Sequence, residues 1–429
     1  MTKSTLCPIR VCAVLVLLLA THLRAETNPP TLEERLTRLE NAIARIEARL
    51  NDTVSADELT PTLKEYGELT RALGWDGKSP LTAVKPAGKE KSLAIGGFIQ
   101  ANYMGGSAPD SRVSGNFNTF LLRRARINLT GNFSENVSFK YEADFGNNSL
   151  AAKTGVSGQF TDTYVSWTKF PNASVRLGQF KSPFGYEQLL GDPKLYPIER
   201  SLSNDLLTLG RQIGTMLYGE VADKRINYSL AIFNGTGTNT STNDNQKFLK
   251  VGRVAAILLD AKAGNSKVKL TAGANYYNTE DKGTTFTGRR EGTGLDAQLV
   301  YGPTEFQAEW LQNKKHPTAG LATTASGWSL LGVYNLNPKW QGLVRFDSYD
   351  ANTAKANSTT DEWTFGLSYL LKGDDLKLSL NYITSQQPAP LPNGGLFLTR
   401  VQVLFSFPSY DKIHENPNSP RRRRAFARP

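Results

Sequence analysis

Residues 363–369, WTFGLSY, decide the fold, because a large apolar side chain occupies every second position. Residues 376–382, LKLSLNY, repeat this alternation, and residues 137–145, VSFKYEADF, show it a third time. Successive side chains of a β-strand point to opposite faces, so each stretch predicts a strand with one apolar and one polar face. In a soluble sandwich the apolar faces would pack on each other. Here the aromatic residues recur near the strand ends, as in the interfacial girdles of membrane barrels.

Sixteen alternating segments can be placed between residues 93 and 407, with about 20 residues for each strand and its connection. Short turns, such as Pro171-Asn172, alternate with longer loops. The sequence therefore predicts an all-β fold, a 16-stranded antiparallel transmembrane β-barrel over residues 93–407. The expected long loops are 105–118, 182–210, 235–247, 279–292, 314–326, 351–361 and 386–395.

The first 25 residues have the order of a secretory signal. Lys3 and Arg10 precede the apolar run 11–20, which is too short to span a bilayer as a helix. The cleavage end Leu-Arg-Ala is imperfect, since Leu23 stands where alanine is preferred. We expect residues 1–25 to be a cleaved signal peptide, with a retained anchor as the alternative.

Residues 26–54 contain a heptad pattern that predicts a periplasmic coiled coil and a homotrimer. Charged residues fill most of the other positions, and Arg35 to Glu40 resembles the Arg-apolar-x-x-apolar-Glu pattern of short three-stranded coiled coils. An amphipathic helix that lies on its own domain is the alternative. The heptad positions a and d are Leu32, Leu36, Leu39, Ile43, Ile46 and Leu50.

The remaining segments flank the barrel. Residues 55–92 are polar with scattered proline, and we expect a short helix and a linker there. Residues 408–429 form a basic tail with four consecutive arginines, 421–424, which we expect to be a disordered, solvated charge run. An anionic lipid or an acidic envelope polymer is the alternative partner of this tail. An even number of strands places the coil and the tail on the same, periplasmic side.

Composition disfavours catalysis and nucleic-acid binding. Cys7 and Cys12 lie in the signal-like segment, and only His316 and His414 remain outside it among the histidines. Neither has a second histidine or a cysteine nearby, so we expect no metal site, no cofactor and no enzyme. The net charge of +11 is divided among several segments and forms no dense patch outside the tail, which argues against a nucleic-acid partner.

The polar faces of the strands predict the lining of the lumen. Arg124, Arg126 and Lys140 fall on these faces, whereas Arg123 has the opposite parity and could reach the rim near a strand end. In a pore, guanidinium and ammonium groups favour anions over cations. Glu142 and Asp144 also fall on the lumen side, so ordinary cross-barrel salt bridges are an equal alternative.

Three motifs resemble the family of phosphate-selective porins O and P. They are residues 176–187, RLGQFKSPFGYE, then 198–202, IERSL, and 210–214, GRQIG. Residues 120–126, FLLRRAR, resemble the second strand of that family. The resemblance covers the barrel and implies a trimer of 16-stranded barrels whose third loop, here 182–210, narrows the lumen.

The same resemblance implies an anion path lined by basic residues at the constriction. The candidates are Arg123, Arg124, Arg126, Lys140, Lys181, Arg200 and Arg211, of which Arg126 and Lys140 come from the strand pattern. Each could also be structural, since Arg200 beside Glu199 could pin the loop to the wall.

The expected function is passive diffusion of small anions, phosphate among them, across a bacterial outer membrane, with outer-membrane lipid around the barrel. The loops 235–247 and 351–361 are rich in Asn, Thr and Ser, which keeps a general porin open as an alternative. A structural barrel that tethers the envelope is a second alternative. An outer-membrane hydrolase would have only His316 as its base and is disfavoured.

Overall fold

The computed structural model describes residues 91–113, 117–146, 158–264, 266–283 and 286–407. The expected signal peptide 1–25, the coiled coil 26–54, nearly all of the linker 55–92 and the tail 408–429 lie outside the described residues. Within the described residues, no helix is long and apolar enough to cross a membrane.

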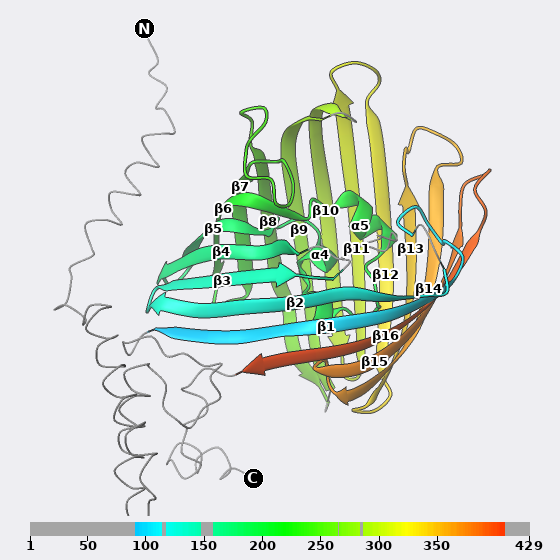
Figure 1. The fold of residues 1–429 in the computed structure, drawn as a ribbon, viewed down its shortest axis with the longest axis horizontal. Helices are drawn as coiled ribbons and strands as arrows, with labels where there is room; N and C mark the ends of the chain where they lie inside the picture. Colours follow the sequence, from blue (N-terminus) through cyan, green and yellow to red (C-terminus); the bar gives the residue numbers. More distant parts are fainter. Residues whose placement is uncertain (1–90, 114–116, 147–157, 265, 284–285, 408–429) are drawn as a thin grey trace, which may run out of the picture. The chain divides into compact units, whose positions relative to one another are not determined.

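The described residues form one closed antiparallel barrel of sixteen strands, in which each strand pairs with its sequence neighbours and β1 pairs with β16 (Figure 1). The predicted fold class is confirmed. The strands are β1 Ser92–Gly106, β2 Thr119–Ser134, β3 Val137–Asp144, β4 Gln159–Phe170, β5 Ala173–Lys181, β6 Arg211–Val221, β7 Ile226–Phe233, β8 Leu249–Ala263, β9 Ser266–Lys282, β10 Thr287–Tyr301, β11 Thr304–Pro317, β12 Thr323–Asn335, β13 Trp340–Asp350, β14 Thr359–Lys372, β15 Leu376–Gln386 and β16 Gly394–Phe407.

Burial along the strands is the reverse of that in a soluble protein. In β14 the side chains of Trp363 and Phe365 are 46% and 47% exposed, whereas the intervening Thr364 and the preceding Glu362 are buried. The predicted alternation is confirmed, and its apolar side faces outward, as expected for a membrane barrel. Outward apolar residues suit contact with lipid chains, and inward polar residues suit a lumen.

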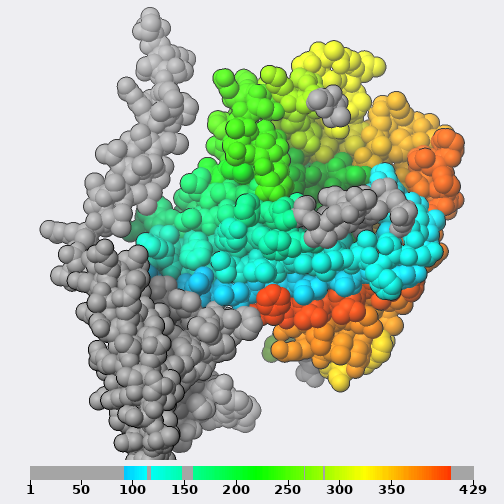
Figure 2. All heavy atoms as spheres, in the orientation of Figure 1, coloured from blue at the N-terminus to red at the C-terminus, as the bar shows by residue number. Residues whose placement is uncertain are grey.

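Two of the expected long loops are wrong. Most of 279–292 belongs to β9 and β10, and most of 314–326 belongs to β11 and β12, so that these two hairpins rise above the neighbouring strands (Figures 1 and 2). Both strand pairs continue beyond the apolar band with polar residues on both faces, and polarity alone resembles a loop. The connection 145–158 was not predicted as a loop, and it separates β3 from β4.

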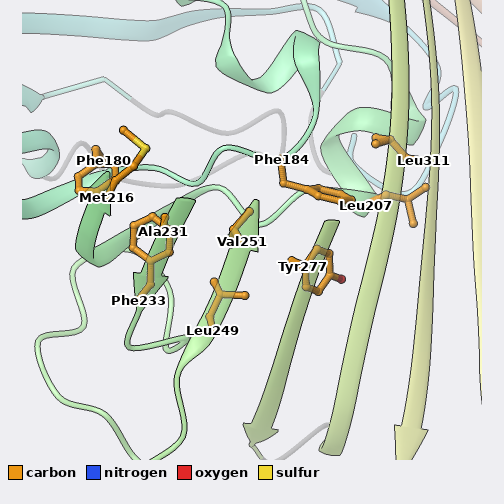
Figure 3. Close-up of a cluster of buried hydrophobic side chains, with 10 residues drawn as sticks. All are labelled: Phe180, Phe184, Leu207, Met216, Ala231, Phe233, Leu249, Val251, Tyr277 and Leu311. Atoms are coloured by element: carbon orange, nitrogen blue, oxygen red, sulfur yellow. The ribbon is translucent and has the colours of Figure 1, made fainter. Parts of the chain in front are cut away.

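The third loop, 182–210, carries three short helices: α4 Tyr186–Leu189, η2 Asp192–Lys194 and α5 Leu202–Leu207. Several of its apolar side chains are buried, and Phe184 meets the ring of Tyr277 on the inner wall edge-on at 4.8 Å between centroids (Figure 3). Leu207 joins the same cluster. Helix α5 contacts β11, β12 and β13. The loop therefore folds into the barrel, as the resemblance implied.

Candidate functional site

Glu199 of the third loop is the acceptor for three arginines of the barrel wall. Arg123 binds it in a bidentate manner, with both nitrogen–oxygen distances at 2.9 Å. Arg400 donates to it at 2.5 Å and Arg124 at 3.4 Å. Burial by itself would raise the pKa of Glu199, but the charges of Arg123, Arg124 and Arg400 hold it below its ordinary value.

A β-bulge explains why two consecutive arginines both reach the lumen. In the pairing of β1 with β2, Gln100 lies opposite Arg124 while Ala101 lies opposite Leu122, which leaves Arg123 as the extra residue. Arg123 and Arg124 are both buried. Strand parity had placed Arg123 on the outer face, and it failed because a bulge shifts the alternation by one residue.

Asp192 of η2 gathers a second set of arginines. Its carboxylate lies 2.6 Å from Arg126, 2.8 Å from Arg200 and 3.5 Å from Arg124. Because Arg200 belongs to the same loop, its pair with Asp192 folds the loop on itself. Arg200 also donates to the carbonyl oxygen of Leu190 at 3.0 Å.

Carboxylates of the opposite wall hold backbone amides of the loop. Asp347 of β13 accepts from the amides of Leu202 and Ser203 at the start of α5. Glu309 of β11 accepts from the amide of Tyr186 and, at 2.7 Å, from the side chain of Asn204. The loop therefore crosses the lumen and is fastened to the walls on both sides.

The first long loop adds another clamp. Arg112, between β1 and β2, pairs with Asp110 at 2.9 Å, with Asp205 of α5 at 3.2 Å and with Glu362 of β14 at 3.3 Å. It also donates to the carbonyl oxygen of Arg200 at 2.9 Å. Sequence reasoning missed this residue, because a single arginine in a loop carries no periodic signal.

A cavity of about 550 Å³ remains beside the third loop, against the wall of β1 to β6, β16 and the turn after β14. Lys140 pairs there with Glu142 and Asp162, both at 3.1 Å. Arg211 donates to Asp162 at 2.8 Å. The charged side chains that line the cavity are Arg126, Lys140, Lys181, Arg211, Lys372, Glu142, Asp162, Asp192 and Asp375.

Lys181 differs from the other cations of this cavity. Its ammonium donates to the carbonyl oxygen of Leu190 at 2.6 Å, and no carboxylate of the described residues lies within salt-bridge distance. An ammonium has three donors, so two remain for another acceptor. Lys181 is the last residue of β5 and lines the cavity at the point where the loop begins.

The seven predicted site residues thus divide into two groups. Arg126, Lys140, Lys181 and Arg211 line one cavity. Arg123, Arg124 and Arg200 do not line it, and they pair with the loop carboxylates Glu199 and Asp192, as Arg126 also does with Asp192. Arg345 and Arg400 were outside the predicted set, although their strand parity points into the lumen. Arg345 donates to the carbonyl oxygen of Glu199 at 2.9 Å, which no sequence pattern could indicate.

The closed barrel, its apolar outer face and the loop that narrows its lumen define an outer-membrane porin. The chain belongs to the family of phosphate-selective porins O and P, whose model matches residues 93–389. It is similar to Porin O of Pseudomonas aeruginosa, with 25% identity over 399 residues that cover 74% of this chain and 89% of that protein. Family and fold are those of channel proteins.

Two solved structures share the fold at low sequence identity. The anion-selective porin from Comamonas acidovorans has a TM-score of 0.52 and 15% identity, covering 74% of this chain and 100% of that one. OmpT of Vibrio cholerae, solved in a trimer form, has a TM-score of 0.53 and 9% identity over 74% and 100%. At these identities the likeness concerns the fold alone.

Proposed function

We propose that this porin lets small anions, phosphate among them, diffuse passively through the lumen narrowed by loop 182–210. The observation that carries the proposal is Lys181, a cation without a described carboxylate partner on the wall of the remaining cavity. Ammonium groups bind phosphate as point charges, so this residue is suited to hold an anion in transit.

The neighbouring charges set the strength of the effect. Lys140 and Arg211 share Asp162 and Glu142, so part of their field is neutralised. An anion that enters the cavity meets, within a mixed wall, one lysine that no described carboxylate approaches to salt-bridge distance. We therefore expect anion preference with weak, rapidly reversible binding, which conduction requires.

A substitution of Lys181 tests the proposal. In planar bilayers, phosphate added to wild type in KCl should block part of the chloride current, because it competes for the Lys181 ammonium. Lys181→Gln should lower the apparent phosphate affinity about tenfold, as expected for the loss of one charged hydrogen bond.

The matched control is Lys314→Gln. Lys314 is exposed on the outer face of β11, whereas the preceding Asn313 is buried on the lumen face. Equal phosphate block in wild type and Lys181→Gln would show that Lys181 does not hold the anion.

A general porin is the second candidate. Glu142, Asp162 and Asp192 line the same cavity as the cations and favour a weakly selective path. Wild type without phosphate block and with similar permeability to both ions would support this candidate. A structural envelope tether would conduct no ions at all.

We further propose that the protein is a homotrimer in the outer membrane, with its coil and tail in the periplasm. The heptads of residues 26–54 support three-stranded assembly, although they lie outside the described residues. OmpT of Vibrio cholerae provides an example of a trimer with this fold.

A further inference from the structure

A hollow lies on the outer wall of the barrel, away from the lumen. It has a volume of about 640 Å³ and is formed by β5 to β9. Its floor is Gly252 of β8, where an added Cβ atom would meet only Leu230 within 4 Å, at 3.5 Å from the Cδ2 atom. The missing side chain leaves a gap between Leu230 and Tyr276, which lie opposite Gly252 on the two adjacent strands.

The polarity of this hollow changes along the strands. The row nearer the long connection 234–248 contains Ile232, Lys250 and Asn278, which are paired in register, and Lys250 is the one charged residue among the described residues that line the hollow. The next row, further from that connection, contains Leu217, Leu230 and the ring of Tyr276. All three are exposed on the outer wall. The hollow therefore suits a ligand with a charged group at the loop end and an apolar chain next to it, which is the arrangement of a membrane lipid.

We propose that this hollow binds an acyl chain of a phosphorylated lipid of the outer leaflet, with the lipid phosphate on Lys250. Lys250 is exposed, and the described residues offer its ammonium no carboxylate within salt-bridge distance. A lysine at this depth can place its charge at the headgroup level while its stem lies on apolar surface. The charge complementarity between lysine and phosphate determines which lipid class fits.

The chain offers a matched pair of tests and controls. Gly252→Leu fills the hollow, and Lys250→Ala removes its cation. Gly332 of β12 also has room for a side chain, since the nearest atom, Cε1 of Phe306, is 3.6 Å away. Gly332→Leu and Lys314→Ala therefore make the same chemical changes elsewhere on the barrel.

The measurement is native mass spectrometry of the purified full-length protein in detergent, titrated with bisphosphorylated lipid A as the probe. Wild type and both controls should retain the lipid. Lys250→Ala should weaken binding about tenfold, as for one charged hydrogen bond, and Gly252→Leu should abolish it. Unaltered KCl conductance will show that each variant is folded, because both residues lie outside the lumen.

Three outcomes would overturn the proposal. Retention of lipid A by Gly252→Leu at wild-type affinity would show that the hollow is not the site. If the wild-type protein bound dephosphorylated lipid A as tightly as bisphosphorylated lipid A, the phosphate would not be recognised. A change of oligomeric state in Gly252→Leu with lipid retention intact would assign the surface to a second copy of the chain.

Discussion

At the scale of single residues, most of the lumen cations are engaged with carboxylates. Arg123, Arg124 and Arg400 converge on Glu199, and all four side chains are buried. Removing one member of a buried ion cluster leaves the others uncompensated and costs about 3 to 5 kcal/mol. These arginines therefore act first as fasteners of the loop, and their contribution to the field inside the pore is reduced accordingly.

Glu199→Gln tests this view. It keeps the size of the side chain but leaves three guanidinium groups without their shared negative charge, so the segment around Glu199 should be held less tightly to the wall of β2 and β16. We expect a lower thermal unfolding temperature and a larger or noisier single-channel conductance.

The control is Glu291→Gln, which breaks a 2.8 Å pair with the half-exposed Arg289 and should change stability by at most about 1 kcal/mol. Identical conductance and stability in Glu199→Gln and wild type would refute the fastening role of Glu199.

At the scale of elements, the strands could be predicted and the irregular features could not. The two-residue alternation of 363–369 and 376–382 marks β14 and β15, because lipid and lumen impose opposite demands on the two faces. The same alternation carries no sign of the bulge at Arg123 or of strand extensions beyond the apolar band. The position of the third loop followed from its length and motif, but its fastening to Asp347 depends on tertiary contacts.

The coiled coil is the element whose role stays a prediction. Deletion of residues 31–50 removes all six heptad positions, so we expect weaker trimers on seminative gels, with the barrel still folded and heat-modifiable. Deletion of the tail 408–429 is the matched control and should leave trimers intact. Unchanged trimers after deletion of 31–50 would remove the coil from the assembly.

At the scale of the whole molecule, the third loop crosses the lumen and separates an arginine-rich wall from a wall that carries carboxylates. Arginines of β2 and β16 hold its carboxylates on one side, while Asp347 and Glu309 hold its amides on the other. The remaining cavity, against β1 to β6, β16 and the turn after β14, is lined by Lys181. Four of the seven residues predicted from sequence meet there: Arg126 and Lys140 come from strand faces that alternate regularly, and Lys181 comes from a motif at the end of β5. Arg211, which also comes from a motif, completes the set at the start of β6.

The central claim is that the net field of this constriction favours anions. The most direct test is the reversal potential of the purified wild-type protein in a planar bilayer under a KCl gradient. We predict a reversal potential whose sign shows that chloride is more permeant than potassium. Its size should be moderate, because Glu142 and Asp162 offset part of the positive charge. A reversal potential of the sign set by potassium would contradict the claim.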